Sequence, residues 1–522
     1  MTSNVPGNAN VKNDPQKHLH TGLYPPVTYL LIDDLFVERM EGVHRVMCPA
    51  EKHPEPILKA DKPWDGLYVL LHGSFLYDHD EKTFKLWYYR HDPDFAKRYP
   101  ELGWAESYAY AVSTDCLNWE KPELGLVSWR GSRRNNLVKF PPFGGVGMAA
   151  TFKNPTSTDA RRPYIGMGMS RFRTPRGKTP VYWNRKNNKG VTNGLFVYDS
   201  PDGFTWRRRP RMLVSNTIVT DNAFCHGYDE DLSKWIFWLQ GRAFGKFGKF
   251  RSIGVSFAKD LEYLPYPQEI LTPDDEDPPD CEFNHFASLK VPGGYVGLVT
   301  DFRPHEGCKK EPQLAFSRDA RVWDRPAGRD PVISVGPRGS WDEMDIYVAN
   351  PIAVGDHVYI IYHGCITGNG DYFFTGKKGK NAYVRVAKRP AALPDGRLNL
   401  PGIGMAKLKR DRWAAIEPAR SSGFLHIRRM YWANRELRVN TDARKGSIRA
   451  ELRDTIGRPI PGFTFKESIP FRGDSLGHRM TWKNKRMLPA KMLGTPYAQG
   501  TVGRLISIHF HLERARLFSF TC

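Results

Sequence analysis

The chain has 522 residues, of which 40% are hydrophobic, 25% charged and 13% aromatic. These proportions are those of a globular protein and exclude a wholly disordered chain. The 77 Lys and Arg residues outnumber the 56 Asp and Glu residues, so the formal net charge is +21, which favours polyanionic partners. No apolar run approaches the ~18 residues of a membrane span, so we expect no membrane partner. The start of the chain lacks the apolar core of a secretory signal, which predicts a cytoplasmic protein unless a leader has been removed.

Strand signals dominate the chain. Short runs rich in Val, Ile, Tyr, Phe and Trp recur between Gly, Pro, Asp and Asn, a pattern that predicts β-strands. The clearest runs are 69–77, 84–89, 108–113, 195–198, 235–239, 295–299 and 358–362. No segment has a sustained apolar stripe with helical spacing and caps. Together with 40 Pro and 47 Gly residues, this pattern predicts an all-β protein.

A short motif, S-x-D-x-x-x-W, recurs along the chain at Ser113–Trp119, Ser200–Trp206 and Ser317–Trp323. Degenerate copies lie at 256–263 and 406–413. In such a motif the Asp closes a turn through its side chain, and the Trp packs between neighbouring sheets. Five four-strand units fit around these anchors between about residues 66 and 420, which predicts a five-bladed β-propeller.

The sequence changes character after Gly423, where apolar and polar residues alternate over roughly 100 residues. That alternation predicts a separate β-sandwich. We therefore expect three parts: a flexible N-terminal arm over 1–22, a five-bladed propeller over 23–420 and a C-terminal β-sandwich over 421–522.

Local motifs point to a known family. They are found at 84–89, 221–224, 251–253, 274–282, 314–319, 339–342, 438–443 and 460–463. With them the chain, over roughly residues 20–522, resembles glycoside hydrolase family 32, the invertase and levanase family, and most of all the bacterial family-32-like proteins. The resemblance implies a five-bladed propeller with a carboxylate-lined axial pocket, followed by a β-sandwich.

The chain also departs from that family. The W-M-N-D-P-N-G motif, whose Asp is the nucleophile, is missing near the N-terminus. The R-D-P motif occurs only at Arg329–Pro331, in the fourth unit rather than the second, and Asp280-Cys281-Glu282 is only distantly similar to the pair that carries the acid. The resemblance therefore does not imply fructose specificity.

Acidic residues are concentrated where the innermost strand of each unit is expected to begin. In a propeller these starts converge at one end of the axial channel, which makes that end the expected ligand site. Glycosidic cleavage needs one protonated carboxyl and one ionised carboxyl, which neighbouring acids in a partly dry funnel provide. We predict Glu282 as the acid, Asp342 as the base or nucleophile, and Asp221 as the residue that stabilises the transition state or accepts a sugar hydroxyl.

Further residues of the funnel are predicted to bind the sugar. Arg forks match carboxylates and sulfates, and Trp rings stack on sugar rings. The predicted substrate-binding residues are Trp64, Asp65, His72, Arg242, Arg251, Asp280 and Glu343. The alternative is structural: these acids cap strand starts or pair with Arg242, Arg251 and Arg303.

The sequence therefore predicts an exo-acting glycosidase whose substrate is an oligosaccharide or polysaccharide, with an acidic or sulfated glycan as the hypothesis that fits the charge. Two alternatives remain open, a non-catalytic glycan-binding propeller and a sialidase-like enzyme. Sialidases have six blades and a repeat with one more residue between Asp and Trp, which disfavours the second alternative.

Other partners have less support. The acidic run 274–282 admits a Ca²⁺ ion, but it lacks the Gly and spacing of an EF-hand loop, so we predict no cofactor or resident metal. No helix-turn-helix, zinc finger or RNA-binding aromatic motif is present, so we expect no nucleic-acid partner. The seven scattered Cys residues include no C-x-x-C pair and are expected to be free thiols.

Overall fold

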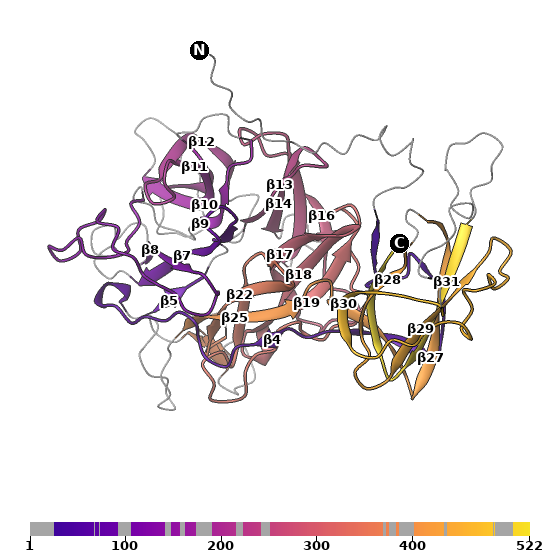
Figure 1. Cartoon of the computed structure of the whole chain (residues 1–522). Coiled ribbons are helices and arrows are strands. Elements are labelled where there is room, and N and C mark those ends of the chain that lie inside the picture. Colours follow the sequence, from indigo (N-terminus) through magenta and orange to yellow (C-terminus); the bar gives the residue numbers. More distant parts are fainter. Residues whose placement is uncertain are drawn as a thin grey trace, which may run out of the picture. The chain divides into compact units, whose positions relative to one another are not determined.

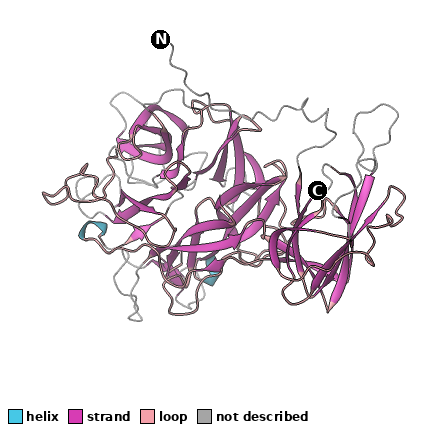
Figure 2. Ribbon diagram, in the orientation of Figure 1, coloured by secondary structure: helices cyan, strands magenta, loops and turns pink. Residues whose placement is uncertain are grey.

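In the computed structural model, the residues described are 26–66, 68–71, 74–91, 106–140, 148–156, 162–173, 191–215, 223–241, 251–368, 372–374, 383–385, 401–432, 436–483, 485 and 505–522. They form β-strands and two short 3-10 turns, η1 (Pro63–Asp65) and η3 (Pro304–Glu306), with no α-helix among them (Figure 2). No helix within these ranges is long and apolar enough to cross a membrane. The all-β class predicted from the sequence is confirmed.

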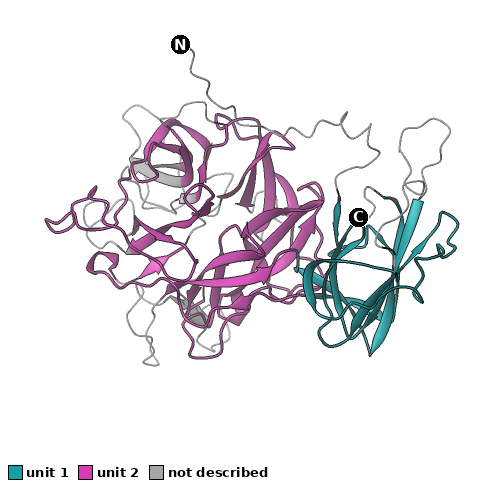
Figure 3. Cartoon of the chain, in the orientation of Figure 1, with its two compact units in different colours: residues 1–46, 411–522 teal, residues 47–410 magenta. Residues whose placement is uncertain are grey.

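The chain divides into two compact units, one of residues 47–410 and the other of residues 1–46 with 411–522 (Figure 3). Residues 26–46 fall in the same unit as 411–522, whereas the sequence analysis places them with the propeller over 23–420. Strands β1 (Thr28–Leu30), β2 (Val37–Glu41) and β3 (Val43–Met47) pair with β32 (Arg516–Thr521), β27 (Ser422–Tyr431) and β26 (Ala414–Pro418), respectively. No local sequence pattern indicates these pairings, because the partners lie far apart along the chain.

The first sheet of the 47–410 unit contains four strands, labelled in part in Figure 1: β5 (Val69–Leu70), β6 (Phe75–Asp78), β7 (Thr83–His91) and β8 (Glu106–Ser113). Strands β5 and β6 both pair with β7 along one of its edges, so they act together as one interrupted strand. Strand β8 pairs with β7 over its whole length. The sheet is antiparallel throughout, as hairpin connections require.

Two further sheets are four-stranded antiparallel meanders in chain order. One consists of β9 (Met148–Lys153), β10 (Tyr164–Arg173), β11 (Val191–Ser200) and β12 (Arg207–Ser215). The other consists of β13 (Ala223–Asp229), β14 (Lys234–Gly241), β15 (Ser252–Ala258) and β16 (Gln268–Leu271). Strand β14 contains the run predicted at 235–239.

An eight-stranded sheet joins two further groups of strands. The first group is β17 (Glu282–Val291), β18 (Gly294–Arg303) and β19 (Lys309–Ser317). The second is β20 (Asp345–Val348), β21 (Ile352–Val354), β22 (His357–Cys365), β25 (Gly402–Lys409) and β4 (Glu51–Lys52). Only one parallel pair, Lys310 with Asp345, joins the groups. A separate hairpin consists of β23 (Tyr372–Phe374) and β24 (Tyr383–Arg385).

The S-x-D-x-x-x-W motif forms the same turn each time it occurs. In the copy at Ser317–Trp323, the Asp319 carboxylate accepts the backbone N–H groups of Arg321 and Val322 at 2.8 and 2.9 Å. The residue after the Asp has a left-handed backbone, with φ of 64° at Cys116, 80° at Gly203 and 62° at Ala320. The predicted turn-closing role of the Asp is therefore confirmed in all three full copies.

The other unit contains two sheets that share one hydrophobic core. One sheet has the order β3-β26-β32-β28-β30 with β1 beside β32, and the other has the order β2-β27-β31-β29. The strands not yet introduced are β28 (Arg438–Asp442), β29 (Ser447–Arg453), β30 (Asp474–Arg479) and β31 (Leu505–Glu513). Side chains from both sheets, among them Val439, Ile448, Phe510 and Phe520, are fully buried in this core.

A buried carboxylate joins two sheets of the 47–410 unit. Asp229, at the end of β13, is 2% exposed and accepts hydrogen bonds from the Tyr295 hydroxyl at 2.7 Å and the Leu232 N–H at 2.9 Å. The Lys290 ammonium lies 2.8 Å from it. Burial alone raises the pKa of Asp229, but the bonds from Lys290 and Tyr295 outweigh that effect and lower it to about 2. The ionised form is therefore the one that the fold holds.

We expect Asp229→Asn to destabilise the protein in a pH-dependent way. A depressed pKa contributes stability above the unfolded value near 3.9, and that contribution is lost as the pH falls toward 2. The variant should lose roughly 2 kcal/mol at pH 7, with the difference shrinking below pH 4. Chemical denaturation across this pH range measures the effect, and a difference that stays constant down to pH 3 would contradict the assignment.

Candidate active site

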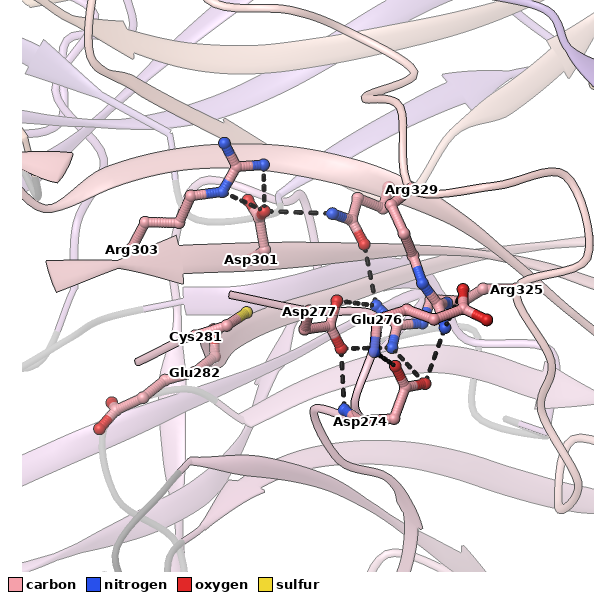
Figure 4. A network of polar contacts seen from close by, with 10 residues as sticks. Asp274, Glu276, Asp277, Cys281, Glu282, Asp301, Arg303, Arg325 and Arg329 are labelled. Carbon is pink, nitrogen blue, oxygen red and sulfur yellow. Dashed lines mark hydrogen bonds and ion pairs between the residues drawn. The ribbon is translucent and has the colours of Figure 1, made fainter. Parts of the chain in front are cut away.

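The loop before β17 is held by a network of ion pairs (Figure 4). The Arg325 guanidinium donates to Asp277 at 2.5 and 2.7 Å and to Asp274 at 2.8 Å. Arg329 pairs with Asp274 at 2.7 Å and with Glu276 at 3.2 Å. The acidic run of the sequence thus bonds to arginines, and this fixes the loop that leads into Glu282.

Glu282 is the first residue of β17 and pairs with Arg251, which immediately precedes β15. The Arg251 Nε lies 3.4 Å from the Glu282 Oε2, and the two side chains are 17% and 13% exposed. The guanidinium also lies over the Phe302 ring, 5.4 Å from its centre. Its buried Nη1 donates no hydrogen bond to any described residue. The partly buried Glu282 carboxylate therefore lies beside a guanidinium that has a buried N–H group without a hydrogen-bond acceptor among the described residues.

Behind Glu282 lies a second carboxylate–arginine pair. Asp301 in β18 is 2.6 Å from the Arg303 Nη2 and accepts the Gln313 side-chain amide at 3.1 Å. Burial raises the pKa of Asp301 to about 6, although the charge of Arg303 opposes the shift. Phe302, between them in sequence, is the cross-strand partner of Glu282. The pair thus supports the strand that carries Glu282.

Further charged groups surround the Cys308 thiol. Burial raises the pKa of this thiol to about 11, and the charges of Lys310, Asp345, Arg251 and Asp280 also act on it. Lys310 Nζ lies 3.5 Å from Asp345 Oδ2, at the start of β20. Asp280 accepts the His305 backbone N–H at 2.7 Å and contacts its imidazole. We name this group the Glu282 cluster, consisting of Arg251, Asp280, Glu282, Asp301, Arg303, Lys310 and Asp345.

Asp342, predicted as base or nucleophile, is enclosed by protein groups. Its Oδ2 lies 2.7 Å from Lys52 Nζ and accepts the Tyr362 hydroxyl at 3.2 Å. Its Oδ1 accepts the Ser340 hydroxyl at 3.1 Å, and the side chain is only 3% exposed. The neighbouring Glu343 accepts the backbone N–H of Gly339 at 2.7 Å. These contacts are of the kind that the structural alternative describes, and the role of Asp342 as base or nucleophile stays a prediction.

Trp64 and Asp65 belong to a network in the first sheet. Asp65 is fully buried, lies 2.6 Å from Lys121 Nζ and accepts the Tyr88 hydroxyl at 3.1 Å. The Trp64 indole donates to Asn136 at 2.6 Å. These partners hold both side chains of η1 in place beside β7. Asp221, His72 and Arg242 lie outside the described residues, and their predicted roles stay predictions.

Sequence reasoning missed Asp301 and Lys310. The signal was present for Asp301, a charged residue in the otherwise largely apolar and buried strand β18, but Lys310 lies beside the charged residues Lys309 and Glu311 in β19. Such a residue needs a partner, because a lone buried charge is costly. Arg303 was named only as a residue that pairs with acids, and the structure places it in such a pair with Asp301.

The chain matches no protein-family model. It also matches no curated protein. Solved structures resemble it at low identity. An N-acetylgalactosamine deacetylase from F. plautii, in complex with blood group B trisaccharide, is 14% identical with a TM-score of 0.40, and the match covers 75% of this chain and 96% of that one.

Two further structures are similar to the same degree. A fructofuranosidase variant from Schwanniomyces occidentalis complexed with fructosylnystose is 10% identical, with a TM-score of 0.41 and coverage of 92% of this chain and 99% of that one. A β-1,2-mannobiose phosphorylase from Listeria innocua is 10% identical, with a TM-score of 0.40 and coverage of 68% and 96%. Similarities at this level assign neither a fold family nor an activity to the chain.

We expect the two predicted carboxylates to respond differently to the same isosteric change. Asp342→Asn removes the carboxylate charge that pairs with Lys52 in a largely buried place, and it should lower the free energy of unfolding by about 2 kcal/mol or more. Glu282→Gln breaks a longer contact and should cost less than about 1 kcal/mol. Thermal and chemical denaturation of the two variants measure this difference. Equal stability of the Asp342 variant and the parent protein would refute the structural role.

Proposed function

We propose that the 47–410 unit is a five-bladed β-propeller and that the other unit is a β-sandwich. Five groups of antiparallel strands follow one another along the chain, and the last group is completed by β4, which precedes the first. This joining of the chain's early strand to its last blade is how a ring of sheets avoids open edges. Two sheets around one core are the arrangement of a sandwich.

We further propose that the protein is a glycoside hydrolase, and the Glu282 cluster is the observation that carries this proposal. In a propeller, β17 and β20 would be the inner strands of adjacent blades, and Glu282 and Asp345 are their first residues. Carboxylates at neighbouring strand starts provide the pair that glycosidic cleavage requires. Glu282 is the catalytic carboxylate that we assign from the described residues.

Glu282 keeps the role of acid that the sequence predicts. Its carboxylate lies 3.4 Å from the Arg251 guanidinium, a contact that positions it at the start of β17. Asp221 keeps its predicted role, which is to stabilise the transition state or to accept a sugar hydroxyl. Asp342, enclosed by Lys52 and Tyr362, supports the fold near the site instead.

One cation of the cluster, Arg251, favours an acidic or sulfated substrate. Arg251 offers a buried donor without a partner among the described residues, and a guanidinium fork binds carboxylate and sulfate groups in two-point contacts. A propeller funnel that is closed at its base admits the end of a glycan chain, which favours exo-cleavage. We therefore propose release of single terminal sugars.

A non-catalytic glycan-binding propeller is the second candidate. The observation that favours it is the engagement of Asp65 and Asp342 in ion pairs with Lys121 and Lys52, which leaves fewer acids for chemistry. This candidate predicts that the same oligosaccharides bind and are not cleaved.

The deciding experiment is hydrolysis of neutral, uronic and sulfated oligosaccharides by the parent protein, Glu282→Gln and Glu230→Gln. Glu230 is an exposed residue in the turn after β13 and provides a control with the same chemical change. We expect single sugars from one substrate class, and a loss of roughly 10³-fold or more in kcat only for Glu282→Gln. Binding without turnover in all three proteins would establish the second candidate instead.

A further inference from the structure

A cleft of about 690 Å³ lies at one end of the two-sheet unit formed by residues 26–46 and 411–522. Three connections between strands line it: β26 to β27, β28 to β29, and β31 to β32. Each connection contributes cations, namely Arg420 from the first, Arg444 and Lys445 from the second, and Arg514 and Arg516 from the third. We call this feature the turn cleft.

The backbone frame of the turn cleft is well bonded. The Arg514 N–H donates to the Ser421 carbonyl at 2.9 Å, which ties the third connection to the first. A Cβ added to Gly446 would lie 1.7 Å from the Glu513 carbonyl oxygen, so the second connection approaches the third too closely for any side chain. The Glu513 side chain also accepts the Ser447 hydroxyl at 2.9 Å. The three turns therefore form one preorganised rim.

The charge of the turn cleft is unbalanced. Five cations face two acids, Asp442 and Glu417, and both acids are already paired. Arg444 donates to Asp442 at 2.6 and 2.9 Å, and these bonds lower the pKa of that carboxyl. Arg516 donates to Glu417 at 2.6 Å. No ion pair to a described residue is recorded for Arg420 or Lys445, and Arg514 meets Glu513 only through a longer-range interaction.

From these observations we propose that the turn cleft binds sulfate groups on a glycan chain, as a second glycan site outside the Glu282 cluster. Three cations without a close ion pair to a described residue, on a rigid rim, match a tetrahedral anion with several oxygens, and guanidinium groups bind such anions through two donors at once. The volume is that of a site for a ligand of a few sugar rings.

A sulfated glycan fits the turn cleft better than a nucleic acid does. Single-stranded nucleic acids bind through bases stacked on aromatic rings, and none of the residues that line the cleft is aromatic. Duplex DNA is read by a helix or ribbon that enters a groove, whereas this feature is a concave end of a sheet unit. A short sulfated chain presents its charges outside the rings, where turns can reach them.

The test measures binding at physiological ionic strength in the Glu282→Gln background, so that no hydrolysis interferes and the proposed activity is not assumed. The probes are a heparin hexasaccharide, its desulfated counterpart, which retains the carboxylates, and a short single-stranded DNA. The cleft variant combines Arg420→Ala, Lys445→Ala and Arg514→Asn. Asn is chosen at 514 because the backbone there has φ of 41°, which Asn tolerates.

A matched control removes three exposed cations of the same unit that do not line the cleft, Arg449, Arg458 and Lys466, each replaced by Ala. We expect the parent to bind the heparin hexasaccharide more tightly than the other two probes. The cleft variant should bind it at least tenfold more weakly, and the control less than about threefold more weakly, with unchanged melting temperatures in both.

Three outcomes would overturn the proposal. Equal losses in the two triple variants would show that net charge alone attracts the probe. Tighter binding of the DNA, lost in the same cleft variant, would assign the turn cleft to nucleic acid. If the hexasaccharide does not bind to the Glu282→Gln protein with an intact turn cleft, the cleft is not a glycan site. This conclusion holds whatever the hydrolysis assay on the unmodified protein shows for the Glu282 cluster.

Discussion

The pairing of β4 with β25 is the contact on which the arrangement of the 47–410 unit depends. It spans only two residue pairs, yet it joins residues 51–52 to a strand some 350 positions away in sequence. Lys52 reinforces it by reaching Asp342 at 2.7 Å and the Ser334 carbonyl at 3.0 Å. An edge strand left open is prone to pair with other chains, and this short strand covers the edge of β25.

The covering of β25 by β4 explains why two of the predicted acids, Asp342 and Glu282, have different surroundings. Asp342 follows Gly339 and Ser340 in a turn, and its oxygens meet Lys52, Tyr362 and Ser340, so it is used in holding the sheet together. Glu282 lies 3.4 Å from Arg251, and its side chain is 13% exposed. A carboxylate whose oxygens are all bonded to the protein cannot approach a substrate without breaking those bonds, which cost more to break when buried.

The sequence predicted the parts of the fold that depend on local patterns. The all-β class, the strands around residues 235–271 and the Asp-closed turns of the S-x-D-x-x-x-W motif all follow from nearest neighbours along the chain. The unit to which residues 26–46 belong does not follow from local patterns, because β1 and β2 are positioned by hydrogen bonds to strands near the C-terminus. Register between distant strands is set by tertiary packing, which no local window of sequence contains.

Some residues of the candidate site were also predicted from the sequence, and others were missed. Glu282 and Asp280 were predicted because they fall at a strand start, and Arg251 because a guanidinium matches carboxylates and sulfates. The structure brings all three to the surroundings of Cys308 or β17. Asp301 and Lys310 were missed, since their importance comes from cross-strand neighbours in β18 and β19. The roles of Asp65 and Asp342 could not be read from sequence either, because their lysine partners lie 56 and 290 positions away.

The excess of positive charge is distributed unevenly over the described structure, and the amino-acid composition does not show where it lies. Within the Glu282 cluster, all three cations have a carboxylate partner: Arg303 pairs with Asp301, Lys310 with Asp345, and Arg251 with Glu282. In the turn cleft, Arg444 and Arg516 pair with the two acids, and the other three cations of the cleft lining remain without such a pair there. Ion pairs inside a fold cancel charge locally, so only the unmatched cations shape the field that an anion meets. The net charge of +21 therefore matters for recognition mainly where turns gather more cations than acids, as they do at the end of the two-sheet unit.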